Sequence, residues 1–260
     1  DRDVGFQGFT ARNYLFREEF TSRIWATSYD FPAARDGRVK KEILPDQTPS
    51  GAQGWFINTR REKFSDKRVR EALALTMDFP WMNKNLMYGS YERTYSYFQN
   101  TDMAAQGKPS PEELALLEPF RGKIDDAVFG DAYMPPEADG SGSDRTLLRR
   151  ASALLREAKY EIKDGKRVSP TGEAITIEFL INTTSFEPHH SAIISNLRRL
   201  GIDANMRVVD PAQFQLRLQT FDFDITVQRF STSSTPGESM RPFFSSAAAK
   251  LQGSRNVSGI

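Results

Sequence analysis

GWFINTRREKFSDKRVREALALTMD, residues 54–78, is the stretch from which the rest of the chain can be read. Residues 55–57 are a short apolar run that ends in the polar Asn58, a pattern typical of a buried strand that emerges into a cleft. A charged turn follows, and we expect a helix with Ser65 as its N-cap and Asp66 in its first turn, where the helix dipole favours negative charge. Apolar residues then recur at helical spacing and predict one core-facing stripe, formed by Val69, Ala72, Leu73, Thr76 and Met77.

The order of these parts resembles the oligopeptide and dipeptide class of extracellular solute-binding proteins of ABC transporters. The pattern of that family is roughly N-x-x-x-x-P-F-x-D-x-R-V-R-x-A-L-x-x-A-I-D. This chain has Lys63 in place of the proline and Thr76 in place of an alanine, and neither change removes a capping or core position. The matching residues are Asn58, Phe64, Asp66, Arg68, Val69, Arg70, Ala72, Leu73 and Asp78.

The composition is that of a globular protein. Of the 260 residues, 38% are hydrophobic and 12% aromatic, which is enough to build a core. Lys and Arg number 35 and Asp and Glu 34, a formal net charge of +1, so no field of the whole chain attracts nucleic acid or an anionic membrane. The absence of cysteine excludes thiol catalysis, disulfides and thiolate metal sites.

The sequence also bears on localisation. No segment approaches the roughly 18 to 20 apolar residues that cross a bilayer, and the first residues contain no signal-peptide core. The chain begins at Asp1 without an initiator Met. We therefore expect a mature or excised fragment, periplasmic by its family resemblance, with any export signal outside this chain.

Helical periodicity and capping residues predict most of the helices. Gly201 follows one predicted helix as its C-cap, and Pro211 occupies the first position of another, after Asp210. Residues 140–143 (GSGS) precede a strongly amphipathic helix and are expected to form a flexible surface bridge. Besides the opening helix, the predicted helices are residues 13–20, 79–88, 111–117, 144–160 and 188–200, and the residues that follow Asp210.

Strands alternate with these helices in the second half of the chain. The pair Asp164 and Gly165 is a hairpin signal. From residue 174 to 228 the order strand, helix, strand, helix, strand implies right-handed crossovers and a sheet that is at least partly parallel. The fold class is therefore α/β, a mixed, partly parallel sheet flanked by helices. The predicted strands are residues 39–44, 55–57, 160–163, 166–169, 174–182, 202–209 and 221–228.

The family resemblance continues through this second half. Its motifs L-x-x-L-G-I-D, V-V-D-x-x-x-F and F-D-x-D stand at residues 197–203, 208–214 and 221–224. The aromatic tract at residues 91–98 and the tail at 237–260 resemble the Yej-type branch, which includes peptide and microcin C binding proteins. The resemblance implies one lobe of a two-lobed periplasmic-binding-protein-like fold of type II.

In that family the chain crosses between the two lobes twice, and ligand is trapped at the crossings. By analogy the crossings lie near residues 54–58 and 224–230. The implied organisation is a lead-in at residues 1–53, an α/β substrate-binding lobe at 54–229 and a return segment toward the other lobe at 230–260. The implied function is the solute-binding component of an ABC importer that delivers oligopeptides or peptide-like compounds to the permease, as a monomer without nucleic acid or cofactor.

A catalytic set cannot be assembled from these residues. His189 and His190 are adjacent, not four residues apart as metal ligands on one helical face would be, and we expect them at a solvated helix N-terminus. No G-x-S-x-G elbow is present. Asp222 and Asp224 share one face of the predicted strand and are interpreted as its structural ends. The sequence predicts no catalytic residue and no metal site.

Two other functions remain open at this stage. The alternative is a carboxylate-dependent hydrolase or transferase that uses Asp222, Asp224 or Glu238. A third interpretation is an interaction module that docks on a membrane partner through the basic run at residues 60–70, although interspersed acids make a solvated face the expected role of that run.

The candidate ligand-binding residues are chosen for residue type near the expected crossings. A peptide site needs backbone-like pairing, roomy aromatic walls and charged groups that capture the termini. Many family members hold the peptide amine with an aspartate after the F-D-x-D strand, where this chain has FSTSS at residues 230–234, so Glu238 is considered for that contact. The candidates are Trp55, Asn58, Arg93, Tyr95, Tyr97, Arg229 and Glu238.

Overall fold

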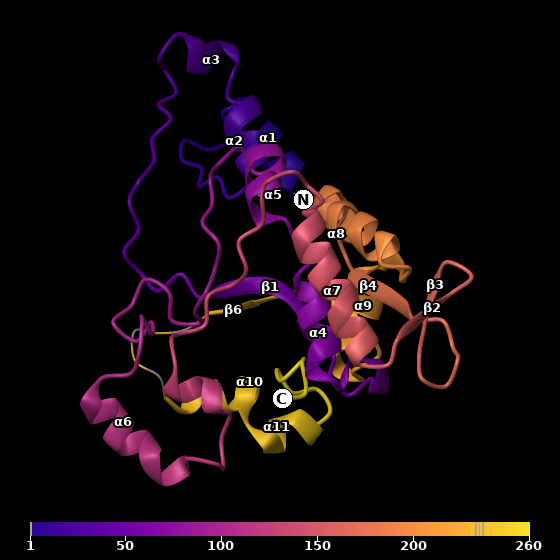
Figure 1. The fold of residues 1–260 in the computed structure, drawn as a ribbon. Helices are drawn as coiled ribbons and strands as arrows, with labels where there is room; N and C mark the ends of the chain where they lie inside the picture. The colour runs from indigo at the N-terminus through magenta and orange to yellow at the C-terminus, as the bar shows by residue number, and fades with distance from the viewer. Residues whose placement is uncertain (1, 232, 234, 236) are drawn as a thin grey trace.

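A four-stranded sheet with the order β1-β6-β4-β5 lies at the centre of the molecule (Figure 1). The computed structural model describes residues 2–231, 233, 235 and 237–260. β6 and β5 both run parallel to β4, and β1 runs antiparallel to β6. This arrangement confirms the α/β class and the partly parallel sheet. The strands are β1 (Ala52–Ile57), β4 (Thr176–Ile181), β5 (Asp203–Val208) and β6 (Ile225–Phe230), and a separate hairpin consists of β2 (Glu161–Lys163) and β3 (Lys166–Val168).

Helices cover both faces of the sheet, as parallel strands joined by helical crossovers require. On one face, α4, α7 and α8 bury apolar side chains, among them Val69, Leu155 and Ile194, in one cluster with Phe179 of β4. On the other face, Phe214 of α9 packs with Leu180 of β4. The helices are α1 (Arg2–Thr10), α2 (Ser22–Thr27), α3 (Pro32–Arg35), α4 (Lys67–Ala74), α5 (Phe79–Leu86), α6 (Pro111–Leu117), α7 (Arg145–Glu157), α8 (Glu187–Arg199), α9 (Pro211–Gln219), α10 (Arg241–Phe244) and α11 (Ser246–Lys250).

The predicted helices at residues 79–88, 111–117, 144–160 and 188–200, and the one after Asp210, are all present, and so is the hairpin at Asp164 and Gly165. Their caps explain why they begin where they do. The Asp144 carboxylate accepts from the backbone N–H groups of Thr146 and Leu147 at 2.8 and 3.0 Å, which satisfies donors that the first turn of α7 leaves free.

The start of α4 differs from the expectation in one detail. Asp66, not Ser65, is the N-cap, and its carboxylate accepts from the backbone N–H of Arg68 at 2.8 Å. A 3₁₀ turn at Glu62–Phe64 comes first, and the Ser65 hydroxyl donates to the carbonyl of Glu62 at 2.7 Å. The predicted stripe is nevertheless correct at its centre, because Val69, Ala72 and Leu73 are buried.

Two predictions in the lead-in are wrong. Residues 13–20 form no helix; α1 lies earlier, and the side chains of Phe16 and Phe20 are 71% and 70% exposed, so no apolar face stabilises a helix there. Residues 39–44 form no strand, since no neighbouring strand pairs with them among the described residues. Figure 1 shows α1, α2 and α3 together beyond one end of the sheet.

Two further corrections concern segments around the sheet. β6 begins only at Ile225, so Asp222 and Asp224 precede the strand and do not share one of its faces. The GSGS segment is not a free bridge: Gly142 donates its N–H to Asp78 Oδ2 at 2.7 Å, and its carbonyl accepts from Asn196 Nδ2 at 3.0 Å. Its φ of +84° favours glycine, and a Cβ there would meet the Trp81 ring at 3.1 Å.

The end of the chain packs against the turn after β1 and the end of α9. The backbone N–H of Thr59 donates to the carbonyl of Ser258 at 2.9 Å, and the backbone N–H of Gly253 donates to the carbonyl of Gln219 at 2.9 Å. Part of the 230–260 segment is therefore packed on residues 54–229. The division at residues 53 and 229 stays a prediction.

Candidate functional site

The two stretches expected at the crossings are neighbours in one antiparallel ribbon. β1 pairs with β6 along its whole length, from Ala52 opposite Phe230 to Ile57 opposite Ile225. Residues 54–58 and 224–230, near which the two crossings are expected, therefore lie side by side. We call the end of this ribbon that contains Asn58 and residues 221–224 the closed end, and the end formed by residues 52–55 and 227–230 the open end.

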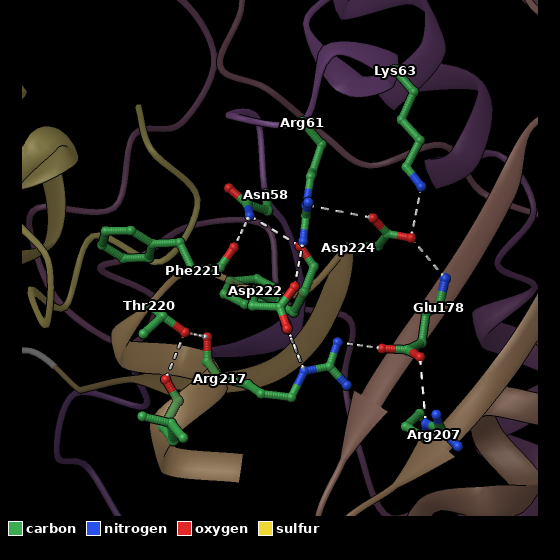
Figure 2. Close-up of polar contacts among 12 residues, drawn as sticks. Asn58, Arg61, Lys63, Glu178, Arg207, Arg217, Thr220, Phe221, Asp222 and Asp224 are labelled. Carbon is green, nitrogen blue, oxygen red and sulfur yellow. Dashed lines mark hydrogen bonds and ion pairs between the residues drawn. The ribbon is translucent and has the colours of Figure 1, made fainter. Parts of the chain in front are cut away.

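Asn58 holds the closed end together. It has no exposed surface, and its Nδ2 donates to the carbonyls of Phe221 and Phe223 at 2.9 and 3.0 Å. Its backbone N–H donates to the carbonyl of Asp224 at 2.9 Å. Figure 2 shows this amide between the turn after β1 and the segment before β6. Asn58 therefore has a structural role, in which both amide hydrogens are used.

The acids before β6 tie three elements to one another (Figure 2). Asp224 Oδ2 accepts from Lys63 Nζ at 2.7 Å and from the backbone N–H of Glu178, in β4, at 3.0 Å. Asp222 lies 2.8 Å from an Arg61 nitrogen and 3.2 Å from Arg217 Nε. The expected solvated face at residues 60–70 is therefore incorrect for Lys63, whose side chain is 26% exposed and bonded to Asp224, whereas Arg61 remains 41% exposed while it pairs with Asp222.

Arg60 is not part of a solvated face either, because its side chain binds the C-terminal segment of the chain. Its guanidinium donates to the carbonyls of Ala249, Asn256 and Val257 at 2.6 to 3.1 Å. The same group stacks over the Phe221 ring, 3.6 Å from its centroid. Burial lowers the pKa of Arg60. Because carbonyl oxygens take up its donors, this cation needs no acidic partner.

The open end presents a different chemistry. Trp55 lies opposite Val227 and Gln53 opposite Arg229, and residues two apart in a strand share a face, so Trp55 and Arg229 lie on the same face of the ribbon. Arg229 is exposed, and no described residue forms an ion pair with it. The carboxyl ends of β4 and β6 also lie at this end, which is where open α/β sheets bind ligands.

β1 is moreover an edge strand of the described sheet, with β6 on one side only. Since the N–H of Asn58 points to β6, alternation directs the backbone N–H and C=O groups of residues 53, 55 and 57 toward the free edge. Such an edge offers a row of main-chain donors and acceptors to an extended peptide.

His190 corrects the expectation of a solvated helix N-terminus. It has no exposed surface, and its ring lies edge-on to Trp55 and Phe179 at centroid distances of 5.6 and 5.7 Å. Nδ1 donates to the carbonyl of Phe186 at 2.7 Å, whereas Nε2 has no hydrogen-bond partner among the described residues. Burial lowers the pKa of His190 and also that of His189, so both imidazoles are neutral at pH 7.

The other candidates lie apart from this face. Tyr97 packs edge-on against Phe230 and Phe244, with centroid distances of 5.4 and 5.1 Å. Phe230 alternates with Arg229, so Tyr97 belongs to the opposite face of the ribbon. The backbone N–H of Tyr95 donates to Gln99 Oε1 at 3.0 Å. Exposed Glu238 forms an ion pair with Arg241 at 2.8 Å, and Arg93 stands over the Phe79 ring at 5.8 Å.

The structure thus brings Trp55 and Arg229 together and adds His190 and the edge at Gln53, which residue types alone did not reveal. Strand alternation could have suggested Gln53, but no sequence signal placed His190 beneath Trp55. In the part of the chain that the structure describes, no cluster of three or more His, Cys, Asp or Glu side chains is placed to hold a metal ion. None of the described helices is long and apolar enough to span a bilayer.

The profile of the bacterial extracellular solute-binding proteins, family 5, middle region, matches residues 14–251 of the chain. The chain belongs to family 5. It is 39% identical to the probable peptide-binding protein YejA of Agrobacterium fabrum, over all of this chain and 43% of that protein. It is 34% identical to the uncharacterized protein YejA of Escherichia coli, over 95% of this chain and 41% of that protein. This member of family 5 therefore spans about two fifths of the length of these curated relatives.

Solved structures of low sequence identity share the family 5 fold. The oligopeptide-binding protein AppA of Bacillus subtilis, determined with a nonapeptide, superposes with a TM-score of 0.69 at 17% identity, over all of this chain and 44% of AppA. NikA of Brucella suis, determined with Fe(III)-EDTA, gives 0.61 at 17% identity, again over all of this chain and 44% of NikA. Both likenesses concern the fold alone.

Proposed function

We propose that the chain supplies one lobe of a periplasmic solute-binding protein, which captures oligopeptides or peptide-like compounds and delivers them to the permease of an ABC importer. The observation that carries this proposal is the open end of the β1–β6 ribbon. There an unpaired strand edge at residues 53–57 adjoins an aromatic ring, Trp55, and an unpaired cation, Arg229. The family and the printed names of its relatives support the same function.

Each part of the open end suits a peptide. A strand edge pairs with the backbone of any extended peptide, independently of its side chains. The partly exposed Trp55 ring offers an apolar wall, and Arg229 attracts a carboxylate. This combination favours capture of a common backbone over recognition of one side chain.

Binding of this kind is a closure between two lobes. Contacts that exist only when both lobes touch the solute shift the population toward the closed form. A single lobe provides part of these contacts, so we expect residues 1–260 on their own to bind peptides weakly. Calorimetry that gave micromolar affinity for residues 1–260 alone would contradict the half-site picture.

The closed end speaks against the hydrolase or transferase alternative. Asp224 is held by Lys63 and a β4 amide, and Asp222 by Arg61 and Arg217. Glu238 is exposed and pairs with Arg241. All three acids thus serve as ion-pair partners within the described chain, which favours structural roles for them over a role as general acid or base.

The experiment uses the complete gene product, with whatever sequence surrounds residues 1–260 in its gene. Gln53→Pro removes one edge N–H that points away from β6, whereas Gln53→Ala keeps it; proline is tolerated on such an edge. With tri-alanine in calorimetry, and with co-purifying solutes identified by mass spectrometry, we expect Gln53→Pro to weaken binding about tenfold and Gln53→Ala about twofold or less. Equal affinities of wild type, Gln53→Pro and Gln53→Ala for tri-alanine would refute the proposal. Co-purification of non-peptide solutes alone would refute it as well.

A further inference from the structure

The side chain of Trp55, at the open end, is held by packing. Its Nε1 is buried and has no hydrogen-bond partner among the described residues, so no directional bond fixes the indole ring. The ring packs on the core cluster and lies edge-on to His190, with 5.6 Å between the ring centroids. The amide of Asn58, at the closed end, is in contrast fixed by two bonds of its Nδ2. The position of the Trp55 ring therefore depends on the groups beneath it.

His190 occupies an enclosure that offers no acceptor for a second proton. Its Nδ1–H donates to the carbonyl of Phe186, which assigns the tautomer of the neutral ring and leaves Nε2 as an acceptor. Nε2 is buried without a hydrogen-bond partner among the described residues, and the rings of Trp55 and Phe179 pack on the imidazole. A proton on Nε2 would create a buried, charged donor, which is costly without an acceptor. The enclosure therefore fits imidazole and does not fit imidazolium.

The charged groups on the elements around His190 do not compensate such a charge. β1 has no titratable side chain from Ala52 to Ile57. The carboxylate of Glu178, in β4, is paired with arginines of β5 and α9. At the start of α8, Glu187 favours the charged imidazole, whereas a charge on the adjacent His189 would repel it. Burial outweighs Glu187, and the pKa of His190 is lowered.

The helix that carries His190 is anchored to the rest of the lobe. In α8, Asn196 Nδ2 donates to the carbonyls of Thr76 and Gly142 at 2.9 and 3.0 Å. Movement of α8 would break both of these buried bonds, whereas movement of the Trp55 ring breaks no hydrogen bond of its Nε1. A charge on His190 is therefore accommodated at the least cost by displacement of the Trp55 ring.

We propose that His190 is a positioning residue for the open end: the neutral imidazole holds the Trp55 ring in place, and protonation displaces the ring and weakens solute capture. This inference rests on the proposed function and adds a proton dependence to it, so that solute is held at neutral pH and released more readily in acid. The backbone groups at the edge of β1 do not titrate. Acid should therefore reduce the affinity without abolishing it.

The first test is calorimetry of the complete gene product with tri-alanine at pH 7.0 and 4.5. The peptide keeps both terminal charges in this range, because its amine and carboxyl pKa values are about 7.7–8.0 and 3.3–3.7. The affinity of wild type is expected to fall about threefold or more from pH 7.0 to 4.5, and His190→Phe to lose most of this fall, because its ring does not titrate. His189→Gln should keep the fall. No decline in wild type, or an equal decline in His190→Phe, would overturn the inference.

The second test does not depend on solute binding. In the complete gene product labelled with 5-fluorotryptophan, the fluorine resonance of Trp55, assigned from Trp55→Phe, is followed by NMR from pH 7.0 to 4.5 without solute. It is expected to shift in wild type and to stay in place in His190→Phe, while the resonance of Trp25, which packs on Tyr29, stays in place in both. If wild type binds no tri-alanine, the proposed function fails for that solute, and this titration still decides the role of His190. A Trp55 resonance that does not respond to pH overturns the inference.

The third test asks whether a ring at position 190 supports Trp55 at neutral pH. His190→Ala leaves space beneath Trp55 and is expected to weaken tri-alanine binding at pH 7.0 about threefold or more, whereas His190→Phe fills the space and should bind within about twofold of wild type. If His190→Ala does not fold, the pH comparison of wild type with His190→Phe decides the inference. Wild-type affinity in folded His190→Ala would show that His190 does not position Trp55.

Discussion

The closed and open ends of the β1–β6 ribbon differ in whether their buried polar groups have hydrogen-bond partners. At the closed end, the buried amide of Asn58 and the carboxylate of Asp224 each find two donors or acceptors at 2.7 to 3.0 Å (Figure 2). At the open end, Trp55 Nε1 and His190 Nε2 are buried without a partner among the described residues. Since an unsatisfied buried group costs about 1 to 3 kcal/mol, the closed end is the better satisfied and the open end the less stable part of the ribbon, which is consistent with the binding role proposed for the open end.

The largest expected effect on stability is at Asn58. Asn58→Ala deletes both Nδ2 bonds and leaves the carbonyl of Phe223 with only a long bond from Arg61 Nε at 3.4 Å and that of Phe221 without its donor, so we expect a loss of about 2 to 4 kcal/mol in the free energy of unfolding. Urea denaturation measures it. The matched control is Asn182→Ala, at an exposed position after β4, with an expected change of about 0.5 kcal/mol or less. If Asn58→Ala and Asn182→Ala lose similar free energies of unfolding, the two buried Nδ2 bonds of Asn58 do not stabilise the closed end.

A smaller loss is expected at Asp224. Its side chain is 13% exposed, and Asp224→Ala leaves the N–H of Glu178 without its acceptor and Lys63 Nζ with the carbonyl of Thr176 alone, so we expect a loss of about 1 to 3 kcal/mol. Asp222→Ala, whose side chain is 58% exposed, should cost about 1 kcal/mol or less. A double-mutant cycle with Lys63→Met measures the coupling. Additive single effects would mean that the Lys63 to Asp224 contact contributes nothing to the closed end.

The buried histidine beneath the open end should make the free energy of unfolding decrease at acidic pH. Burial lowers the pKa of His190, so below its ordinary value of 6.5 the unfolded chain binds a proton that the folded chain does not. Stability is thus present above pH 6.5 and falls as the pH drops, by at most about 1.4 kcal/mol per pH unit for one proton. His190→Phe should flatten the decline in urea midpoints between pH 7.5 and 5.5. His189→Gln, which removes the other lowered pKa, should flatten it separately; an unchanged slope in His190→Phe contradicts the assignment.

The smallest loss of stability is expected for an exposed ion pair outside the ribbon. Glu71 of α4 and Arg150 of α7 form an ion pair whose side chains are 38% and 55% exposed. Glu71→Ala is expected to cost about 0.5 kcal/mol or less, and 1 M NaCl should abolish the difference, because exposed pairs are screened. A larger, salt-resistant loss would show that surface pairs and the buried closed end cannot be ranked by exposure.

Local patterns predicted much of the fold correctly. The Pro111–Leu117 helix, the hairpin at Asp164 and the alternation from β4 to β6 follow from caps, turn residues and hydrophobic period, which act over a few neighbouring residues. The errors at residues 13–20 and 39–44 have the opposite origin. Their patterns suited a helix and a strand, but no partner surface covers them, and short elements without tertiary contacts are not stable.

The candidate site was only partly predictable for the same reason. Trp55, Asn58 and Arg229 were chosen by residue type, and the register then separated them: Trp55 and Arg229 lie on one face of the open end, while Asn58 is enclosed at the closed end. His190 was assigned to solvent because its position on α8 gave no sign that Trp55 and Phe179 would enclose it.

The amino-acid order alone predicted most of the elements of this protein and their order along the chain, because caps, turns and periodicity depend on near neighbours, and its motifs resembled those of a solute-binding family. The tertiary structure decided which polar groups are satisfied. Partners such as Asn58 and Phe221, or Lys63 and Asp224, are more than 150 residues apart in sequence, at separations of 163 and 161. The folding of β1 onto β6 brings them together, and the same pairing places Trp55 and Arg229 on one face of the ribbon beside the free edge of β1 in the described sheet.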